Sequence, residues 1–375
     1  MATMADVARL AGVSVSTVSY ALSGTRPISL STRRRIEQAM TDLGYTPNAF
    51  ARGLKSKRSR IIALLFPARP ETSQRSALEY VLGASDQARR RGYHLMLWTH
   101  DVEAVDDLAQ FAGQGLVDGA LLMEVQPHDP RIQVLVDAGV PFAMIGHNAD
   151  PEGLDFIDSD FGQIAGLAVH HLVGMGHRRM AFVGGPETGG PDGGRPEIRE
   201  EETGAPETIG AVSGWVGTDG AADGSRVENA IQRAATSTGS EFVSVPAERS
   251  ADGGREAFTR LMAKAPETTV IIVFNEHAVP GIMRAAKDLG RRIPEDLSMM
   301  SIDMPGHVAE LTTPPLTTVG ASAVEIGRGA VDLLLRRLDG DMAPARQLLF
   351  RGELNLRGSC APVLNADHTP GETLT

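Results

Sequence analysis

The stretch VARLAGVSVSTVSYAL, residues 7–22, decides how the first part of this chain folds. Apolar residues recur at helical spacing on both sides of Gly12, and glycine allows a tight turn. Ser14 is a suitable N-cap for the second half, in which Val18 and Leu22 lie four residues apart on one face. We therefore predict two short helices joined by a tight turn.

A third helix is predicted after them, because Ser29 can cap a segment in which Ile36, Met40 and Leu43 recur at helical spacing. Two helices joined by a turn, with a third packed on them, form a helix-turn-helix unit. Such a unit places its second helix in the major groove of DNA, with the start of that helix at the base edges. The predicted contacts on it are Ser14, Val15, Ser16, Thr17, Ser19 and Tyr20.

These contacts divide into two kinds. Ser16 and Tyr20 are four residues apart and share a helix face, and Val15 can touch a thymine methyl group. Ser14 and Thr17 are better placed for phosphates, which position a protein without specifying a sequence. Taken singly, each of these residues also fits an ordinary solvated helix face, so the prediction depends on the whole pattern.

The distribution of charge supports a polyanion as partner. The chain of 375 residues has a formal net charge of −11, yet residues 1–60 hold ten basic and three acidic side chains. A basic head on an acidic body is typical of a protein whose head binds a polyanion while the body stays off it. A merely solvated basic surface remains the alternative on charge alone.

Several motifs together carry a resemblance to a known family. They are MADVARLAGVSVSTVSYALSG (4–24), TRRRIEQAMTDLGYTPNAFARGLKSKRSRIIALLFP (32–67), GYHLML (92–97), DPRIQVLVDAGVPFAMIG (129–146), HLVGMGHRRMAFVGGP (171–186), IPEDLSMMSID (293–303) and TPPLTTVGASAVEIGRGAVDLLL (313–335). They resemble transcription factors of the lactose-repressor-type (LacI/GalR) family over residues 3–355, apart from one insertion.

The resemblance implies a role for residues 48–55, whose helical spacing covers barely two turns and includes Gly53. A helix this short is marginal alone in water. In the family this segment is a hinge helix that orders on operator DNA and enters the minor groove. We therefore predict that Asn48, Arg52 and Leu54 contact DNA, with Leu54 as an apolar wedge between base pairs. In the alternative, Leu54 packs against the body and the segment is a plain linker.

From residue 60 onward, near-continuous apolar strands alternate with amphipathic helices, which is typical of parallel sheets covered on both faces. The resemblance implies two doubly wound lobes joined by three crossovers, like a type I periplasmic binding protein. The predicted domains are a helix-turn-helix head (1–47), a hinge (48–58), a two-lobed body (59–358) and a disordered tail (359–375). Within the body we predict that lobe 1 is 59–158 plus 304–320 and that lobe 2 is 159–303 plus 321–358.

Ligands of such folds lie at the carboxyl ends of the strands, here between the lobes. Asn275 and Glu276 follow one predicted strand and Asp303 follows another. The resemblance implies that Asn275 and Asp303 bind a sugar or nucleobase effector. Turn and helix-capping roles remain alternatives. The full predicted effector set is Arg69, Gln74, His147, Asp160, Arg226, Asn275, Glu276 and Asp303.

Three departures from the family limit what can be carried over. Many relatives have arginine where Tyr20 stands, so operator sequence does not transfer. The loop PARPETSQRSALEY (67–80) lacks the family's aromatics before Tyr80, and Arg69 and Gln74 instead offer donors that suit an anionic group. Residues 186–224 are a glycine-rich, acidic insertion that we expect to be flexible, at the mouth of the cleft.

After that insertion, Ser225-x-x-Glu228 is a capping box that predicts the start of the next helix. Arg226, within this pattern, is the nearest candidate for the family's ligand-clamping arginine.

No catalytic constellation, metal quartet or phosphate-binding loop is visible in the sequence, and we predict no cofactor and no metal. One cysteine, Cys360, fits a reducing compartment, and no apolar run has membrane-spanning length. We predict a cytoplasmic, homodimeric regulator, nucleoid-associated when bound to a pseudo-palindromic operator and most consistent with a repressor controlled by a small molecule such as a sugar. The alternative is a DNA-binding regulator whose cleft has lost its ligand and which is constitutive or controlled by a partner.

Overall fold

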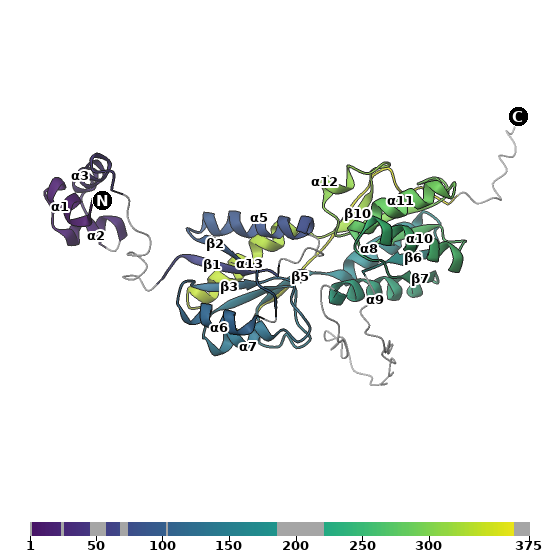
Figure 1. The fold of residues 1–375 in the computed structure, drawn as a ribbon, viewed down its shortest axis with the longest axis horizontal. Helices are drawn as coiled ribbons and strands as arrows, with labels where there is room; N and C mark the ends of the chain where they lie inside the picture. Colours follow the sequence, from purple (N-terminus) through teal and green to yellow (C-terminus); the bar gives the residue numbers. More distant parts are fainter. Residues whose placement is uncertain are drawn as a thin grey trace, which may run out of the picture.

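The computed structural model describes residues 2–23, 26–45, 58–67, 74–102, 104–185 and 221–363. The side chains of residues 23, 74–76 and 221–224 are outside that description. Figure 1 shows a small helical part at the N-terminal end and, beyond it, two lobes in which helices flank a sheet. The prediction of a small helical head and two parallel-sheet lobes is confirmed.

The head consists of α1 (Met4–Ala11), α2 (Val15–Ser23) and α3 (Leu30–Asp42). Thr3 and Asp6 form a capping box at the start of α1, and Ser29 caps α3 by accepting from the Thr32 amide. Gly12 has φ 62°, a left-handed conformation that lets the chain turn sharply into α2. The three helices share a small core of Val7, Ala8, Ala11, Val18, Ile36 and Ala39.

Lobe 1 is built on a six-stranded sheet in the order β11-β5-β4-β3-β1-β2, with every neighbouring pair parallel. Its strands are β1 (Ile61–Leu65), β2 (His94–Trp98), β3 (Gly119–Leu122), β4 (Phe142–Ile145), β5 (Phe156–Ser159) and β11 (Gln347–Phe350). Its helices are α5 (Gln74–Arg90), α6 (Val105–Gly113), α7 (Pro130–Asp137) and α13 (Ala323–Leu338). Alternation along β1 sends Ile62 and Leu64 to the core under α5 and α13, and Ala63 and Leu65 to the core under α6 and α7.

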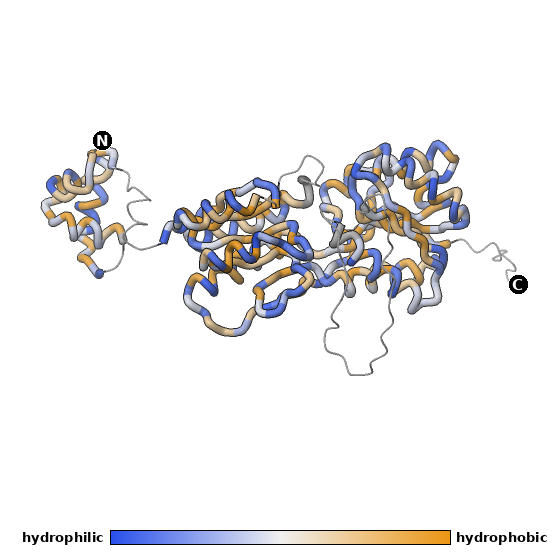
Figure 2. Tube along the Cα trace, turned by 60° about the horizontal axis from the view of Figure 1, so that its bottom comes forward, coloured by the Kyte–Doolittle hydropathy of each residue, from blue (hydrophilic) through white to orange (hydrophobic). Residues whose placement is uncertain are grey.

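Lobe 2 repeats this plan with the order β12-β10-β9-β8-β6-β7, parallel except for β12. Its strands are β6 (Arg179–Val183), β7 (Glu241–Val245), β8 (Val270–Val273), β9 (Ser298–Ile302), β10 (Thr317–Gly320) and β12 (Glu353–Asn355). Its helices are α8 (Phe161–Gly174), α9 (Ala221–Ser237), α10 (Ala251–Lys264), η1 (Glu276–Ala278), α11 (Val279–Asp288) and α12 (Gly306–Ala309). Figure 2 shows the apolar strands enclosed by more polar outer surfaces in both lobes.

The chain passes between the lobes three times, after β5, after β10 and after β11. The predicted division of the lobes at residues 304–320 and 321–358 is wrong in part. β10 pairs with β9 and β12 and therefore belongs to lobe 2, whereas α13 and β11 belong to lobe 1. The physical reason is long-range pairing: β11 extends the sheet at β5, with Leu348 opposite Ile157.

Helix α13 lies against α5 at very short range. A Cβ atom added to Gly327 would lie 2.2 Å from the Tyr80 carbonyl oxygen, and one added to Gly83 would lie 2.1 Å from the Val324 carbonyl oxygen. Buried side chains of α13 such as Leu334 fill the core below. Core packing in its own subunit therefore accounts for the apolar stripe of this helix.

Two further expectations are corrected. Helix α9 begins at Ala221, so Ser225 lies inside it and does not cap it. The tail was expected to be disordered from residue 359, but Ser359 is fully buried and its hydroxyl accepts from the Thr317 amide at 2.8 Å. The expected flexibility of the insertion falls on residues 186–220, which lie outside the described residues.

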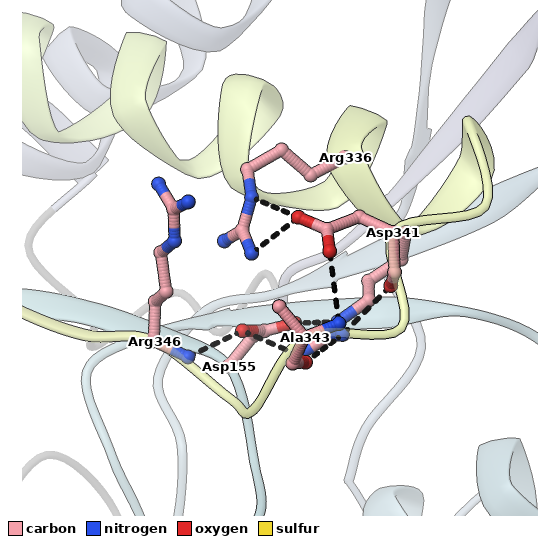
Figure 3. A network of polar contacts seen from close by, with 6 residues as sticks. Asp155, Arg336, Asp341, Ala343 and Arg346 are labelled. Carbon is pink, nitrogen blue, oxygen red and sulfur yellow. Dashed lines mark hydrogen bonds and ion pairs between the residues drawn. The ribbon is translucent and has the colours of Figure 1, made fainter.

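The connection from α13 to β11 is fixed by a polar network around Asp155 (Figure 3). The Arg337 guanidinium and the Arg346 amide both donate to the Asp155 carboxylate, the latter at 2.7 Å. Arg336 and Asp341 form a second ion pair beside it, at 2.7 Å. Asp155 is only 5% exposed, so this network lies at the edge of the lobe 1 core.

Candidate DNA-binding and ligand-binding sites

The start of α2 presents an outward polar face. The Ser14 hydroxyl accepts from the Thr17 amide at 3.1 Å and lies 2.7 Å from the Ser16 hydroxyl. Val15 is 47% exposed although it is apolar, and Ser16 is also exposed. Val18 on the opposite face is fully buried. The helix therefore has the one-sided character that a recognition helix requires.

The structure describes some of the other predicted DNA contacts but not all of them. Thr17, Ser19 and Tyr20 are half-buried on α2. Asn48, Arg52 and Leu54 lie outside the described residues, and so does the expected hinge helix.

Sequence reasoning missed one cation beside α2. The Arg26 guanidinium lies over the Tyr20 ring, with Cζ 5.1 Å from the ring centroid. Arg26 is exposed and follows the end of α2, so no helical spacing connects it with Tyr20. Only the fold brings the two side chains together.

A cavity of about 210 Å³ lies between the lobes, at the carboxyl ends of the parallel strands. Lobe 1 contributes residues at or just after the carboxyl ends of β3, β4 and β5, and lobe 2 contributes residues that follow β6, β7, β8 and β9. Its polar and aromatic lining is Tyr80, Glu124, Asp158, Phe161, Arg249, Phe274, Asn275, Glu276, His277 and Asp303.

Three of the predicted effector residues meet in this cavity: Asn275, Glu276 and Asp303. His147, Asp160 and Arg226 are not in its lining. Asp160 caps α8, where its carboxylate accepts from the Gln163 amide at 3.0 Å. The capping alternative therefore describes what this residue does here.

Two other predicted effector residues cannot be placed in the same way. Arg69 lies outside the described residues, and of Gln74 only the backbone is described.

Asn275 and Asp303 are held in fixed orientations. Asn275 is 7% exposed, and its side-chain amide donates to the carbonyl oxygens of Ala247 at 3.0 Å and Glu248 at 3.2 Å. Asp303 adopts φ 52°, and its carboxylate accepts from the Ala321 amide at 3.2 Å. Positive φ is uncommon for a residue other than glycine and recurs at functional sites.

Glu124 is the counterpart of Asp303 in lobe 1. It follows β3, lines the cavity and has φ 50°. The cavity is therefore bounded from both lobes by a carboxylate residue whose backbone is held in the left-handed region. A surrounding structure must stabilise such backbone conformations, because each costs about 1–3 kcal/mol.

An ion-pair cluster joins the lobes beside the cavity. Asp158 of lobe 1 accepts from Arg226 of lobe 2 at 2.8 Å, and the His147 ring nitrogen lies 2.9 Å from the same carboxylate oxygen. The Arg226 guanidinium also lies over the Phe161 ring, 5.1 Å from its centroid. Arg226 thus bridges the lobes through Asp158.

The environment of Asp158 sets its charge. Burial alone would raise the pKa of the Asp158 carboxyl, but the hydrogen bond from His147 and the charge of Arg226 outweigh burial and hold the pKa below 3.8. A carboxyl whose pKa is lower in the folded than in the unfolded state stabilises the fold at pH values above its unfolded-state pKa. This stabilisation is lost as the pH falls through the folded-state pKa. Asp158 is therefore ionised at neutral pH, and the bridge is lost only in acid, as the pH falls through the lowered pKa of this carboxyl.

The described part of the chain was also compared with the expectations about metal ligands, the cysteine and membrane spans. It contains no group of three histidine, cysteine, aspartate or glutamate side chains placed to hold a metal ion. Burial raises the pKa of the Cys360 thiol, which donates to the Met299 carbonyl oxygen at 3.2 Å. No helix among the described residues is long and apolar enough to cross a membrane.

A recognition helix on a small head, joined to two lobes that enclose a polar cavity, defines a DNA-binding regulator with a ligand-binding body. Comparison with known proteins agrees with this class. Residues 3–48 match the profile of bacterial regulatory proteins of the lacI family, and residues 169–360 match that of the periplasmic binding protein-like domain. The chain belongs to the LacI family of transcriptional regulators.

Relatives and solved structures match it over nearly their full lengths. The HTH-type transcriptional regulator CelR of Thermobifida fusca is 28% identical over 95% of this chain and 98% of its own. The ribose operon repressor of Escherichia coli is 28% identical over 96% of this chain and 100% of its own. A CelR–cellobiose complex has a TM-score of 0.64 at 26% identity, over 96% of this chain and 100% of that one. The Lac repressor dimer bound to operator shares the fold, with a TM-score of 0.75 at 23% identity, over 96% of this chain and 99% of that one.

Proposed function

We propose that this regulator is a homodimeric repressor whose affinity for a pseudo-palindromic operator is set by a small molecule, a sugar or related metabolite, bound between the lobes. The observation that carries the proposal is the cavity itself. Asn275 and Asp303 line it from lobe 2 in fixed orientations, and Glu124 lines it from lobe 1. A ligand that touches both lobes has different contacts when the lobes move, so it shifts the balance between conformations.

Names of relatives support the choice of ligand class. A regulator similar over almost the whole chain was solved with cellobiose, and another relative is named as a repressor of a ribose operon. The alternative, a regulator whose cleft no longer binds a small molecule, is therefore not favoured. We also place the protein in the cytoplasm, on the nucleoid when bound to DNA.

The DNA-binding residues proposed here are Ser14, Val15, Ser16, Thr17, Ser19 and Tyr20 on α2, with Asn48, Arg52 and Leu54 from the segment that follows the head. Selection from a randomised duplex pool tests the function directly. We expect the native protein to enrich a palindromic sequence, with affinity falling linearly in log–log plots against salt. Enrichment of no sequence, or binding that ignores salt, would contradict the proposal.

We predict that Leu54→Ala weakens binding to the selected sequence while binding to unrelated DNA stays the same. An apolar wedge opens a base step, and the bend that results allows further contacts, so its loss should lower specific affinity by about tenfold to a hundredfold. Fluorescence anisotropy with the selected and a scrambled duplex measures both affinities. An equal affinity of Leu54→Ala and the native protein for the selected duplex would leave the segment as a plain linker.

Arg58 is the first described residue of the body after the segment that connects it to the head. Its guanidinium donates to the Leu338 carbonyl oxygen and pairs with Asp339 at 3.2 Å, at the C-terminal end of α13. The hydrogen bond to Asp339 raises the pKa of Arg58. The other end of α13 reaches the cavity, where Ile326 is part of the lining. One helix therefore connects the ligand site with the point where the head is attached.

We predict that Arg58→Ala weakens the effect of a ligand on DNA affinity. The factor by which the ligand changes that affinity should be roughly twofold to fivefold smaller than in the native protein. The control is Arg91→Ala, which removes another cation paired with α13, at Asp332, away from the head. Ligand titrations of the protein–DNA complex measure the coupling. Equal coupling in the two variants would show that α13 does not transmit the ligand signal through Arg58.

A further inference from the structure

The Tyr20 ring and the Arg26 guanidinium form a pair at the DNA-facing side of the head. Tyr20 lies one turn after Ser16 on the outward face of α2, and Arg26 follows the helix end. The Arg26 Cζ atom lies 5.1 Å from the ring centroid, within the range of a cation–π contact. Among the described residues of the head, no carboxylate is paired with Arg26.

A ring beneath a guanidinium changes what the guanidinium can do. A cation–π contact does not use the N–H donors as hydrogen-bond donors, so a guanidinium held over a ring can still donate to another partner. The contact also restricts a side chain that otherwise has many rotamers, so less conformational entropy is lost when the donors find a partner. Tyr20 thus holds a rigid donor fork beside the helix that enters the major groove.

We propose that Arg26 reads a guanine in the major groove and that Tyr20 is the residue that positions it. The inference rests on DNA binding through α2. A guanine presents two acceptors, O6 and N7, on its major-groove edge, and a planar guanidinium matches both at once. Arg26 is then a specificity-determining residue supplied from the loop after the recognition helix.

The test is selection from a randomised duplex pool at one fixed salt concentration, with the native protein and three variants: Arg26→Ala, Tyr20→Leu and Tyr20→Phe. We expect Arg26→Ala to lose the preference for guanine at one position of each half-site by roughly tenfold to a hundredfold, with the other positions unchanged. Tyr20→Leu weakens the preference at that same position. Tyr20→Phe restores it, because the ring remains.

Arg34→Ala is the matched control, since it removes one positive charge from α3 without touching Tyr20. It leaves the preference at that position in place, whatever its effect on overall affinity. Thermal unfolding followed by circular dichroism checks that each variant is folded at the temperature of the selection.

Three outcomes overturn the inference. If Arg26→Ala lowers affinity for every sequence alike and reduces the salt slope by about one, Arg26 contacts a phosphate. If Tyr20→Phe loses the preference as fully as Tyr20→Leu, the tyrosine hydroxyl itself reads the base. If the native protein enriches no sequence, the DNA-binding function fails and this inference fails with it, whereas the first two outcomes leave that function intact.

Discussion

Replacing Arg226 by methionine is expected to destabilise the body by about 3 kcal/mol, because it leaves the buried Asp158 carboxylate without its cation. This value is at the low end for a broken buried pair, since Arg226 is 29% exposed and solvent already screens part of the interaction. For a body of this length the loss corresponds to a fall in Tm of about 5 °C. Differential scanning calorimetry measures it.

The matched control for this prediction is the double variant Asp158→Asn/Arg226→Met. Removing the charge of both partners leaves no uncompensated ion, so most of the lost stability should return. The asparagine keeps an acceptor for His147, which lies 2.9 Å from Asp158 in the native protein. If the single and double variants unfold at the same temperature, the contribution of Arg226 comes from its packing on Phe161 and not from the ion pair.

Asp155→Ala is expected to cost about 3–5 kcal/mol, the largest loss that we predict for a single substitution. Asp155 binds the Arg337 guanidinium and the Arg346 amide, and both are needed to hold the connection between α13 and β11 (Figure 3). The hydrogen bond to Asp155 raises the pKa of Arg337. The guanidinium stays charged when this partner is removed, because arginine is not deprotonated in proteins. Chemical denaturation gives the free energy of unfolding.

Asp296→Ala provides a matched comparison, because Asp296 also accepts two hydrogen bonds from one arginine. The hydrogen bonds from Arg292 lower the pKa of Asp296 to about 2, yet this pair is solvated, and we expect little change in Tm. Losses of similar size in the two variants would contradict the account, because they would show that burial does not determine the strength of these pairs.

The apolar strands of both lobes could be predicted from sequence because each is a short run of branched or aromatic residues between helices. β5 does not show this pattern, since FIDS ends in two polar residues and does not resemble a buried strand. Both are nonetheless buried, because the carboxyl end of β5 abuts lobe 2 and its polar groups find partners there, as Asp158 does with Arg226. β11 and β12 are also hard to predict, because each is short and pairs with a strand far away in the sequence.

The polar end of β5 also explains why one residue of the ligand site could not be predicted from the sequence. The rule that ligands lie at strand ends found Asn275, Glu276 and Asp303, which do line the cavity. Asp158 is not found by this rule, because it lies in β5, a strand that the apolar pattern does not predict. Arg226 was expected to clamp a ligand, but in the structure it pairs across the lobes. Such a contact depends on how two domains dock, which local sequence patterns do not encode.

The way in which the chain crosses between the lobes could not be predicted from local sequence either. The sequence of α13 has the spacing of an amphipathic helix, but that spacing does not indicate which lobe the helix covers. That choice follows from close contacts such as Gly327 against Tyr80 of α5, which require the two backbones to fit together. Individual elements could therefore be predicted locally, whereas their assignment to lobes needed the tertiary structure.

The measurement that tests the central claim most directly is a ligand titration of the protein bound to its selected DNA, followed by fluorescence anisotropy. Sugars that include cellobiose and ribose, and nucleobases, would be tested against the native protein and Asp303→Ala. We predict that at least one compound changes the DNA affinity of the native protein by about fivefold or more, and that Asp303→Ala binds the DNA but no longer responds. A compound that binds the cavity by calorimetry and leaves the DNA affinity unchanged would contradict control of this regulator by a ligand between its lobes.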